Sequence, residues 1–72
     1  MKVHDYVAVL LDIENSPVTR GTTGTVVDKL SDTHFLVEFS DADGQVYEQL
    51  PIHVDNLLVL HRITENLELT KQ

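Results

Sequence analysis

Short apolar runs separated by turn residues recur about every ten positions along this 72-residue chain, which is the pattern of short strands. The runs are rich in Val, Ile, Thr, Leu and Phe, and they are too short for amphipathic helices. A sandwich usually needs about seven strands, so five strands with a long first loop favour a small, partly open β-barrel. We therefore expect an all-β domain with strands at residues 5–12, 24–30, 34–39, 45–50 and 57–62.

The third of these runs shows the clearest alternation of apolar and polar residues. Phe35, Val37 and Phe39 occupy every second position of it. Side chains two apart in a strand point to the same face of the sheet. We predict that these three residues belong to the core.

Two turn signals bound the fourth strand. Asp41–Gly44 offers Asp side chains for local hydrogen bonds and a Gly for a positive φ, as a hairpin loop requires. Its alternating oxygens also suggest a calcium loop, but the third ligand and the spacing to Glu48 do not fit that motif, so a hairpin is the better interpretation. Pro51 has no N–H to donate, and we expect the strand to end or bulge there.

Gly21 and Gly24 lie at the entry to the second strand. A phosphate-binding loop would need Gly-Lys-Ser/Thr ahead of a helix, whereas here a strand follows. We instead predict that both glycines take a positive φ in a tight turn.

The pattern of residues 54–63 is ambiguous. Asp55 or Asn56 could cap a helix, or a short turn could lead into a strand over Leu57–Arg62; we prefer the strand. We expect a barrel domain over residues 1–63 and a tail over residues 64–72 that packs on the barrel or on a second subunit.

Composition limits the partners. With 0 cysteines no disulfide can support so small a core, so oligomerisation is the expected support. The formal net charge of -7 argues against nucleic acid and suits docking of a basic protein. The apolar run Val7–Leu11 is too short for a signal peptide or a membrane span, so we expect a cytoplasmic protein with no membrane association.

We find no pattern typical of an active site or a metal site. The histidines lack the i, i+2 or i, i+4 spacing that would place two imidazoles on one face; they are His4, His34, His53 and His61. No pattern sets a His and a carboxylate beside any serine; the serines are Ser16, Ser31 and Ser40. We predict that the protein is not an enzyme and that it has no metal site and no cofactor.

Several segments resemble a known family. The turn Arg20-Gly21, the strand Gly24–Val27 and the strand Phe35–Phe39 resemble the hairpin of KOW-like, SH3-like barrels. Together with His4-Asp5 near the start and Leu57–Leu60 near the end, they resemble a bacterial domain-of-unknown-function family, number 4926, over roughly residues 1–61. The resemblance implies a five-stranded SH3-like barrel in which the first and last strands are neighbours, with no assigned activity and no catalytic residues to carry over.

Both faces of the first and last strands are apolar, although one face of a small barrel should be wet. Because the resemblance makes these strands neighbours, their outer faces would merge into one apolar patch. Such patches usually mark a partner surface, or else another part of the chain covers them. The candidate interface residues are Tyr6, Ala8, Leu10, Leu58, Leu60, Leu67 and Leu69.

These observations favour a non-enzymatic protein-interaction module that forms a homo-oligomer or binds a second, basic protein. An antitoxin or immunity protein that holds a toxin encoded beside it is one concrete version. The alternatives are a KOW-like nucleic-acid or ribosome-associated module, against which the charge argues, and an accessory domain of an enzyme complex.

Overall fold

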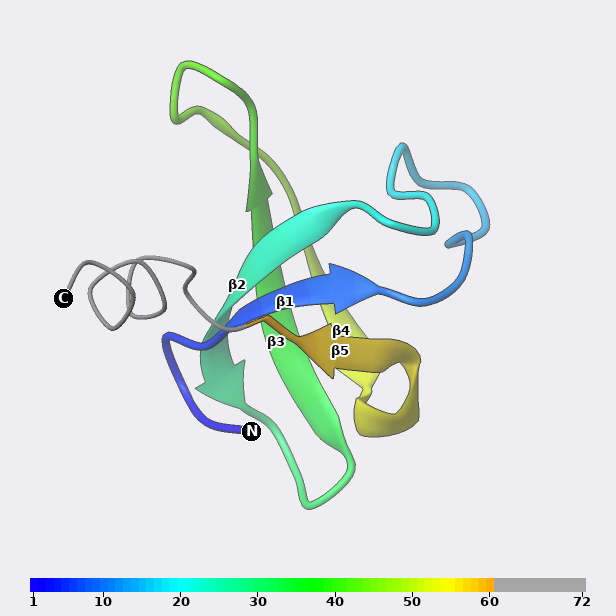
Figure 1. Ribbon diagram of the computed structural model, residues 1–72, viewed down its shortest axis with the longest axis vertical. Coiled ribbons are helices and arrows are strands. Elements are labelled where there is room, and N and C mark those ends of the chain that lie inside the picture. The colour runs from blue at the N-terminus through cyan, green and yellow to red at the C-terminus, as the bar shows by residue number, and fades with distance from the viewer. Residues whose placement is uncertain (61–72) are drawn as a thin grey trace, which may run out of the picture.

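The computed structural model describes residues 1–60. Within that range the backbone forms five strands and one short 3₁₀ helix (Figure 1). In chain order the elements are β1 (Tyr6–Val9), β2 (Thr23–Lys29), β3 (His34–Ser40), β4 (Val46–His53), η1 (Val54–Asn56) and β5 (Leu57–Val59).

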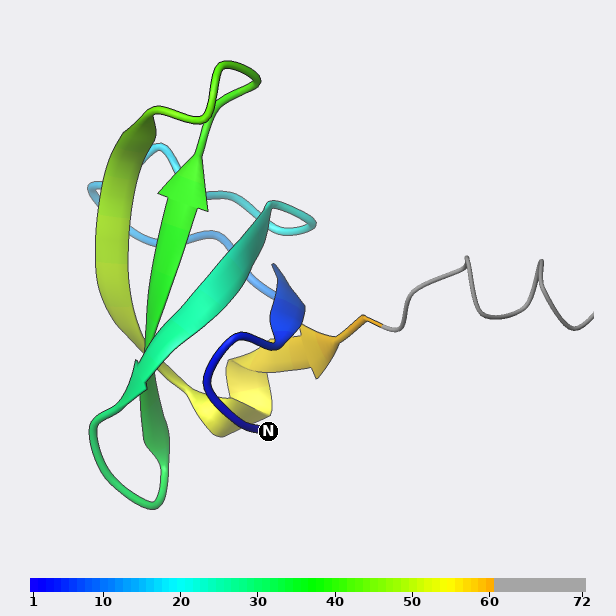
Figure 2. The same ribbon diagram turned by 90° about the vertical axis from the view of Figure 1, so that its left-hand side faces the viewer.

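The strands form a single sheet in the order β4-β3-β2-β1-β5, and every pairing is antiparallel. The first and last strands are therefore neighbours, as the resemblance implied. The sheet curls strongly, so that β3 and β4 lie on one side of the core and β1 and β5 on the other (Figure 2). Since β4 and β5 are not paired, the sheet is not closed into a barrel, which confirms the prediction of a five-stranded, partly open all-β domain.

The core lies between these two sides of the sheet. Phe35, Val37 and Phe39 are 4%, 0% and 0% exposed, which confirms the prediction made from their alternation. The other buried side chains are Val7, Val9, Val18, Val26, Ile52 and Leu57. Most of them come from the same alternation in the other strands, because only one face of each strand points inward.

The long loop between β1 and β2 contributes to this core instead of extending into solvent. Its Val18 is fully buried, and the N–H of Ile13 donates to the Val18 carbonyl at 3.0 Å. The hydroxyl of Ser16 accepts from the Val18 N–H at 3.1 Å and donates to Glu48 of β4 at 2.9 Å. These contacts fasten the loop to the sheet at two points.

The prediction that both glycines before β2 take a positive φ is right for Gly21, at 91°, and wrong for Gly24. Gly24 lies inside β2, where an added Cβ would be 2.8 Å from the Glu38 carbonyl oxygen and 2.8 Å from Cδ1 of Phe39. A glycine is required there because the Phe39 ring packs directly against the backbone of β2.

The expectation that β4 ends or bulges at Pro51 is also wrong. The strand continues to His53, and Pro51 pairs with Leu36 of β3. The Val54 N–H donates to the Thr33 carbonyl at 2.7 Å, and since ladder bonds alternate, this places Pro51 at a position without a bond to β3. As β4 is an edge strand, the missing N–H is tolerated there.

The irregularity in the β3–β4 ladder lies instead near the hairpin. Phe39 pairs with Glu48 and Ser40 with Val46, so Tyr47 is the extra residue. The hairpin loop itself is as predicted: the Asp41 carboxylate accepts from the Asp43 and Gln45 N–H groups, each at 2.9 Å, and Gly44 has a φ of 81°.

The first and last predicted strands are longer than the observed ones, and β5 covers Leu57–Val59 of the expected 57–62. β1 covers four residues of the expected 5–12, because the chain turns into the long loop after Val9. The preference for a turn and a strand over a helix after β4 is correct, with η1 leading into β5. His61, Arg62 and the predicted tail over residues 64–72 lie outside the described residues.

Gly24→Ala should lower the free energy of unfolding by about 1–3 kcal/mol, because neither the Glu38 carbonyl nor the Phe39 ring can retreat without disturbing the core. Gly44→Asn is a matched control, since nothing lies within 4 Å of its added Cβ and Asn tolerates a positive φ, so it should cost less than about 1 kcal/mol. Urea unfolding followed by circular dichroism measures both. An unchanged midpoint for Gly24→Ala would contradict this role of the glycine.

Candidate functional site

The two faces of β1 differ sharply in exposure. Val7 and Val9 are 0% and 1% exposed, whereas Tyr6, the first residue of the strand, is 50% exposed and Leu10, one residue beyond its end, is 42% exposed. Ala8, between the two valines, is half-buried on the outer side. The apolar residues of this segment therefore serve both the core and the surface.

Strand β5 repeats this division and lies directly beside β1. Ala8 pairs with Leu58, which is 52% exposed, while Leu57 is buried. The Leu60 N–H donates to the Tyr6 carbonyl at 2.8 Å, so Leu60 continues the same pairing. The outward side chains of the two strands are thus neighbours across the ladder.

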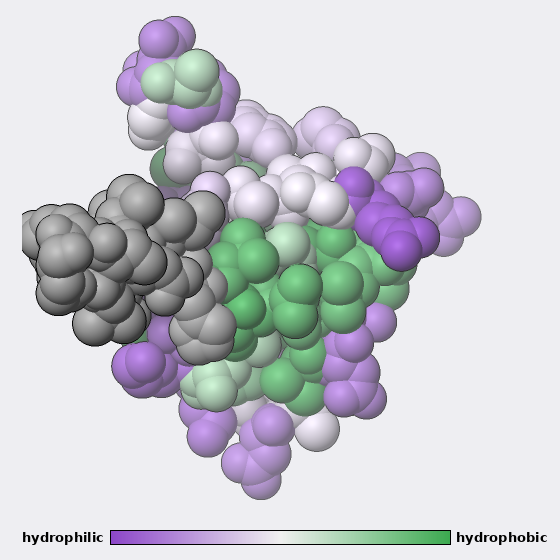
Figure 3. Space-filling model, in the orientation of Figure 1, coloured by the Kyte–Doolittle hydropathy of each residue, from purple (hydrophilic) through white to green (hydrophobic). Residues whose placement is uncertain are grey.

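We call this surface the β1/β5 face; it consists of Tyr6, Ala8, Leu10, Leu58 and Leu60. Hydrophobic residues gather over β1 and β5 in the space-filling view (Figure 3). Tyr6 is aromatic and carries a hydroxyl, the other four side chains are aliphatic, and none of the five is charged. The structure brings these five predicted interface residues together. Leu67 and Leu69, the other two, lie outside the described residues.

The β1/β5 face also has a polar border that the sequence did not reveal. The Tyr6 hydroxyl donates to the Thr23 hydroxyl at 2.9 Å. Thr23 pairs with Ala8 in the ladder between β1 and β2, so its side chain lies diagonally across from Tyr6. Only the register of that ladder makes Thr23 a neighbour, because the two residues are far apart in the chain.

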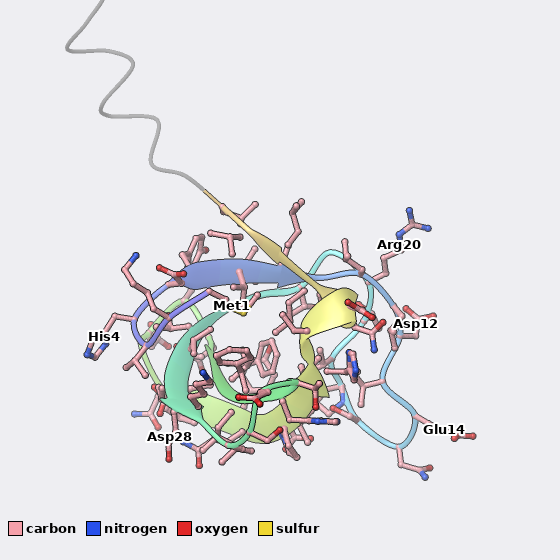
Figure 4. All side chains as sticks on the ribbon, turned by 90° about the horizontal axis from the view of Figure 1, so that it is seen from below. Met1, His4, Asp12, Glu14, Arg20 and Asp28 are labelled. Carbon is pink, nitrogen blue, oxygen red and sulfur yellow. The ribbon has the colours of Figure 1, made fainter. Side chains whose placement is uncertain are left out.

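Charged side chains lie away from any common centre in the described part of the chain. Asp12, Glu14 and Arg20 project from the long loop, and Asp28 projects from the other side of the molecule (Figure 4). Within residues 1–60 no charged or polar residue is buried, and no group of three or more His, Cys, Asp or Glu side chains is placed to hold a metal ion. The same residues contain no helix with the length and apolarity needed to span a membrane.

One acidic side chain at the edge of β1 has a defined electrostatic environment. The Asp5 carboxylate accepts from the backbone N–H of Lys2 at 3.0 Å and from the Lys2 ammonium at 3.2 Å. The backbone hydrogen bond chiefly, and the ammonium after it, lower the pKa of the Asp5 carboxyl. His4 lies within this turn and has a φ of 79°. Strand β1 begins directly after Asp5.

The lowered pKa of Asp5 gives the turn a pH dependence with a defined sign. Because the folded state binds the proton more weakly than the unfolded state, the turn contributes stability above the ordinary carboxyl pKa. That contribution is lost as the pH falls through the lowered value. An NMR titration of the Asp5 carboxyl carbon should give a midpoint below that of Asp in an unstructured peptide, and Lys2→Ala should raise it. A midpoint at or above the peptide value would refute the assignment.

The comparisons with known proteins bear on the whole sheet. A search of curated proteins gave no match. A family model described as a domain of unknown function (DUF4926) matches residues 3–59, which include all five strands and the turn at Asp5. The match covers most of the chain and confirms the family resemblance drawn from its residues. This chain belongs to the DUF4926 family.

Proposed function

We propose that this domain is a non-enzymatic protein-interaction module and that its β1/β5 face binds the same face of a second copy of the chain. The observation that carries the proposal is that Tyr6, Leu10 and Leu58 are about half exposed and lie together on the uncharged β1/β5 face. Each Å² of apolar surface that is removed from water stabilises the complex by about 25 cal/mol. A partner that covered the β1/β5 face would remove this surface from water and be stabilised by that free energy.

The size of the core supports self-association as the way to cover the face. A chain of 72 residues buries only about 60–65% of its unfolded surface, and its margin of stability is correspondingly small. With no cysteine to form a disulfide, burial at a subunit interface is an available source of further stability. A two-fold axis through the β1/β5 face would bury both copies at once, because such an interface uses the same patch twice.

Tyr6 gives the proposed interface an anchor. Tyrosine is enriched in protein interfaces because a large apolar ring carries a polar tip. Here the tip is already held by Thr23 at 2.9 Å, so the ring is positioned before a partner arrives. Less side-chain entropy is then lost on binding.

The net charge of -7 makes the response to salt diagnostic. Two acidic copies repel each other, so added salt should strengthen a dimer formed through an uncharged face. A basic partner protein would show the opposite response, since salt weakens attraction between opposite charges. The sign of the salt effect therefore separates the two kinds of partner.

Leu58→Asp should abolish the dimer, because a carboxylate at the centre of the face would be buried against its symmetry mate. Val46→Asp is the matched control: Val46 is 53% exposed and Leu58 52%, but Val46 lies at the start of β4, outside the β1/β5 face. Sedimentation velocity from micromolar to millimolar concentration, at low and high salt, measures the monomer–dimer equilibrium of each variant.

We expect the unmodified chain and Val46→Asp to dimerise, more strongly at high salt, and Leu58→Asp to remain monomeric with an unchanged circular dichroism spectrum. A strictly monomeric unmodified chain over the whole range would reject self-association. Equal dimerisation of Leu58→Asp would reject the β1/β5 face as the interface.

A further inference from the structure

The fold brings together two histidines that lie far apart in the chain. His34 of β3 pairs directly with His53 of β4, and their rings meet edge to face with centroids 5.1 Å apart. The pair occupies a position of the ladder without hydrogen bonds between the two backbones, where opposite side chains come closest. No spacing rule applied to the sequence would detect it, because the register creates the contact.

Each ring uses the same nitrogen for its contacts with the protein. Nδ1 of His34 lies 2.9 Å from the Thr33 hydroxyl. Nδ1 of His53 accepts from the Asp55 N–H at 3.0 Å and lies 3.8 Å from the Asp55 carboxylate. A hydrogen bond at one imidazole nitrogen determines which nitrogen remains for a ligand. In both rings that nitrogen is Nε2.

We propose that His34 and His53 bind one divalent cation of the zinc type through their Nε2 atoms. Imidazole nitrogen is a preferred ligand of Zn²⁺, Ni²⁺ and Cu²⁺. With bonds of about 2.1 Å and tetrahedral angles, two imidazoles on one ion have centroids about 5 Å apart. The observed centroid distance of 5.1 Å is close to that separation, so both rings lie within reach of a single ion.

Asp55 is the positioning residue of this site. While Nδ1 of His53 accepts a hydrogen bond, the neutral ring carries its proton on Nε2. For Nε2 to bind the ion, the ring releases the Nε2 proton to solvent and takes a proton on Nδ1, so the hydrogen bond from the Asp55 N–H to Nδ1 is given up. The Asp55 carboxylate, at 3.8 Å, is the acceptor for the new Nδ1–H. Histidine ligands of metals characteristically donate their second nitrogen to a carboxylate in this way.

The surroundings favour entry of a cation. His34 is exposed and the side chain of His53 is 38% exposed, so an ion reaches the pair from solvent. The net charge of -7 attracts cations to the surface as a whole. Two protein ligands leave the remaining coordination positions to water, and this site lies on β3 and β4, away from the strands of the β1/β5 face.

Calorimetric titration of the full chain with ZnCl₂ tests the proposal, with MgCl₂ as the comparison ion because Mg²⁺ prefers oxygen ligands. We expect Zn²⁺ to bind one to one and Mg²⁺ not to bind. His34→Asn and His53→Asn should each weaken Zn²⁺ binding by about tenfold or more, since even the loss of a supporting partner costs about 10–100-fold. His4→Asn should leave the affinity unchanged: His4 lies in the turn before β1, outside the pair formed by His34 and His53, and Asn accepts its φ of 79°.

A His34→Asn variant with undiminished Zn²⁺ affinity, or an equal loss in His4→Asn, would overturn the site. Because His53 also caps η1, circular dichroism must show that His53→Asn is folded; if it is not, His34→Asn decides the question alone. Asp55→Asn should weaken Zn²⁺ binding about tenfold without changing the melting temperature of the metal-free protein. The Asp55 group that contacts Nδ1 within hydrogen-bond distance is its backbone N–H, which this substitution retains.

Discussion

Strand β1 is four residues long, yet it is hydrogen-bonded along both edges, to β2 and to β5. Val7 pairs with Gly24 on one side and with Val59 on the other. Side chains of a strand alternate between the faces of the sheet, so this double pairing determines which apolar groups enter the core and which remain outside. On β1 and β5, consequently, one face contributes to the core and the other forms the candidate interface.

Strand β2 and the long loop between β1 and β2 complete the core. Gly24 leaves room for the Phe39 ring to pack directly against the backbone of β2. The long loop places Val18 in the core, and the hydrogen bond from Ser16 to Glu48 ties the loop to β4. Since no polar or charged residue is buried among those that the structure describes, the polar side chains that could bind a ligand are accessible from solvent.

The net charge of -7 acts in opposite directions on the two proposals. It opposes the approach of a second copy, so the β1/β5 face depends on apolar burial and is helped by the absence of charge among its side chains. It favours the arrival of a cation at the pair formed by His34 and His53. The two surfaces belong to different strands, and each can be altered by substitution without touching the other.

The sequence by itself determined the all-β class, the core face of β3 and the hairpin loop Asp41–Gly44. These depend on local rules: alternation along one strand for Phe35, Val37 and Phe39, and short-range hydrogen bonds for the loop. The apolar outer faces of β1 and β5 were also visible as composition, and the family resemblance supplied their adjacency. Local reasoning failed where a residue depends on a partner strand, as Gly24 and Pro51 do.

Only the tertiary structure decided the register. It placed Pro51 where no bond to β3 is needed, set Thr23 beside Tyr6, and joined two histidines that the chain separates. Register is a relation between strands, and a shift of one residue would turn every side chain to the other face. For that reason the sequence determined which residues are apolar, and the pairing of the strands decided which of them meet at the surface.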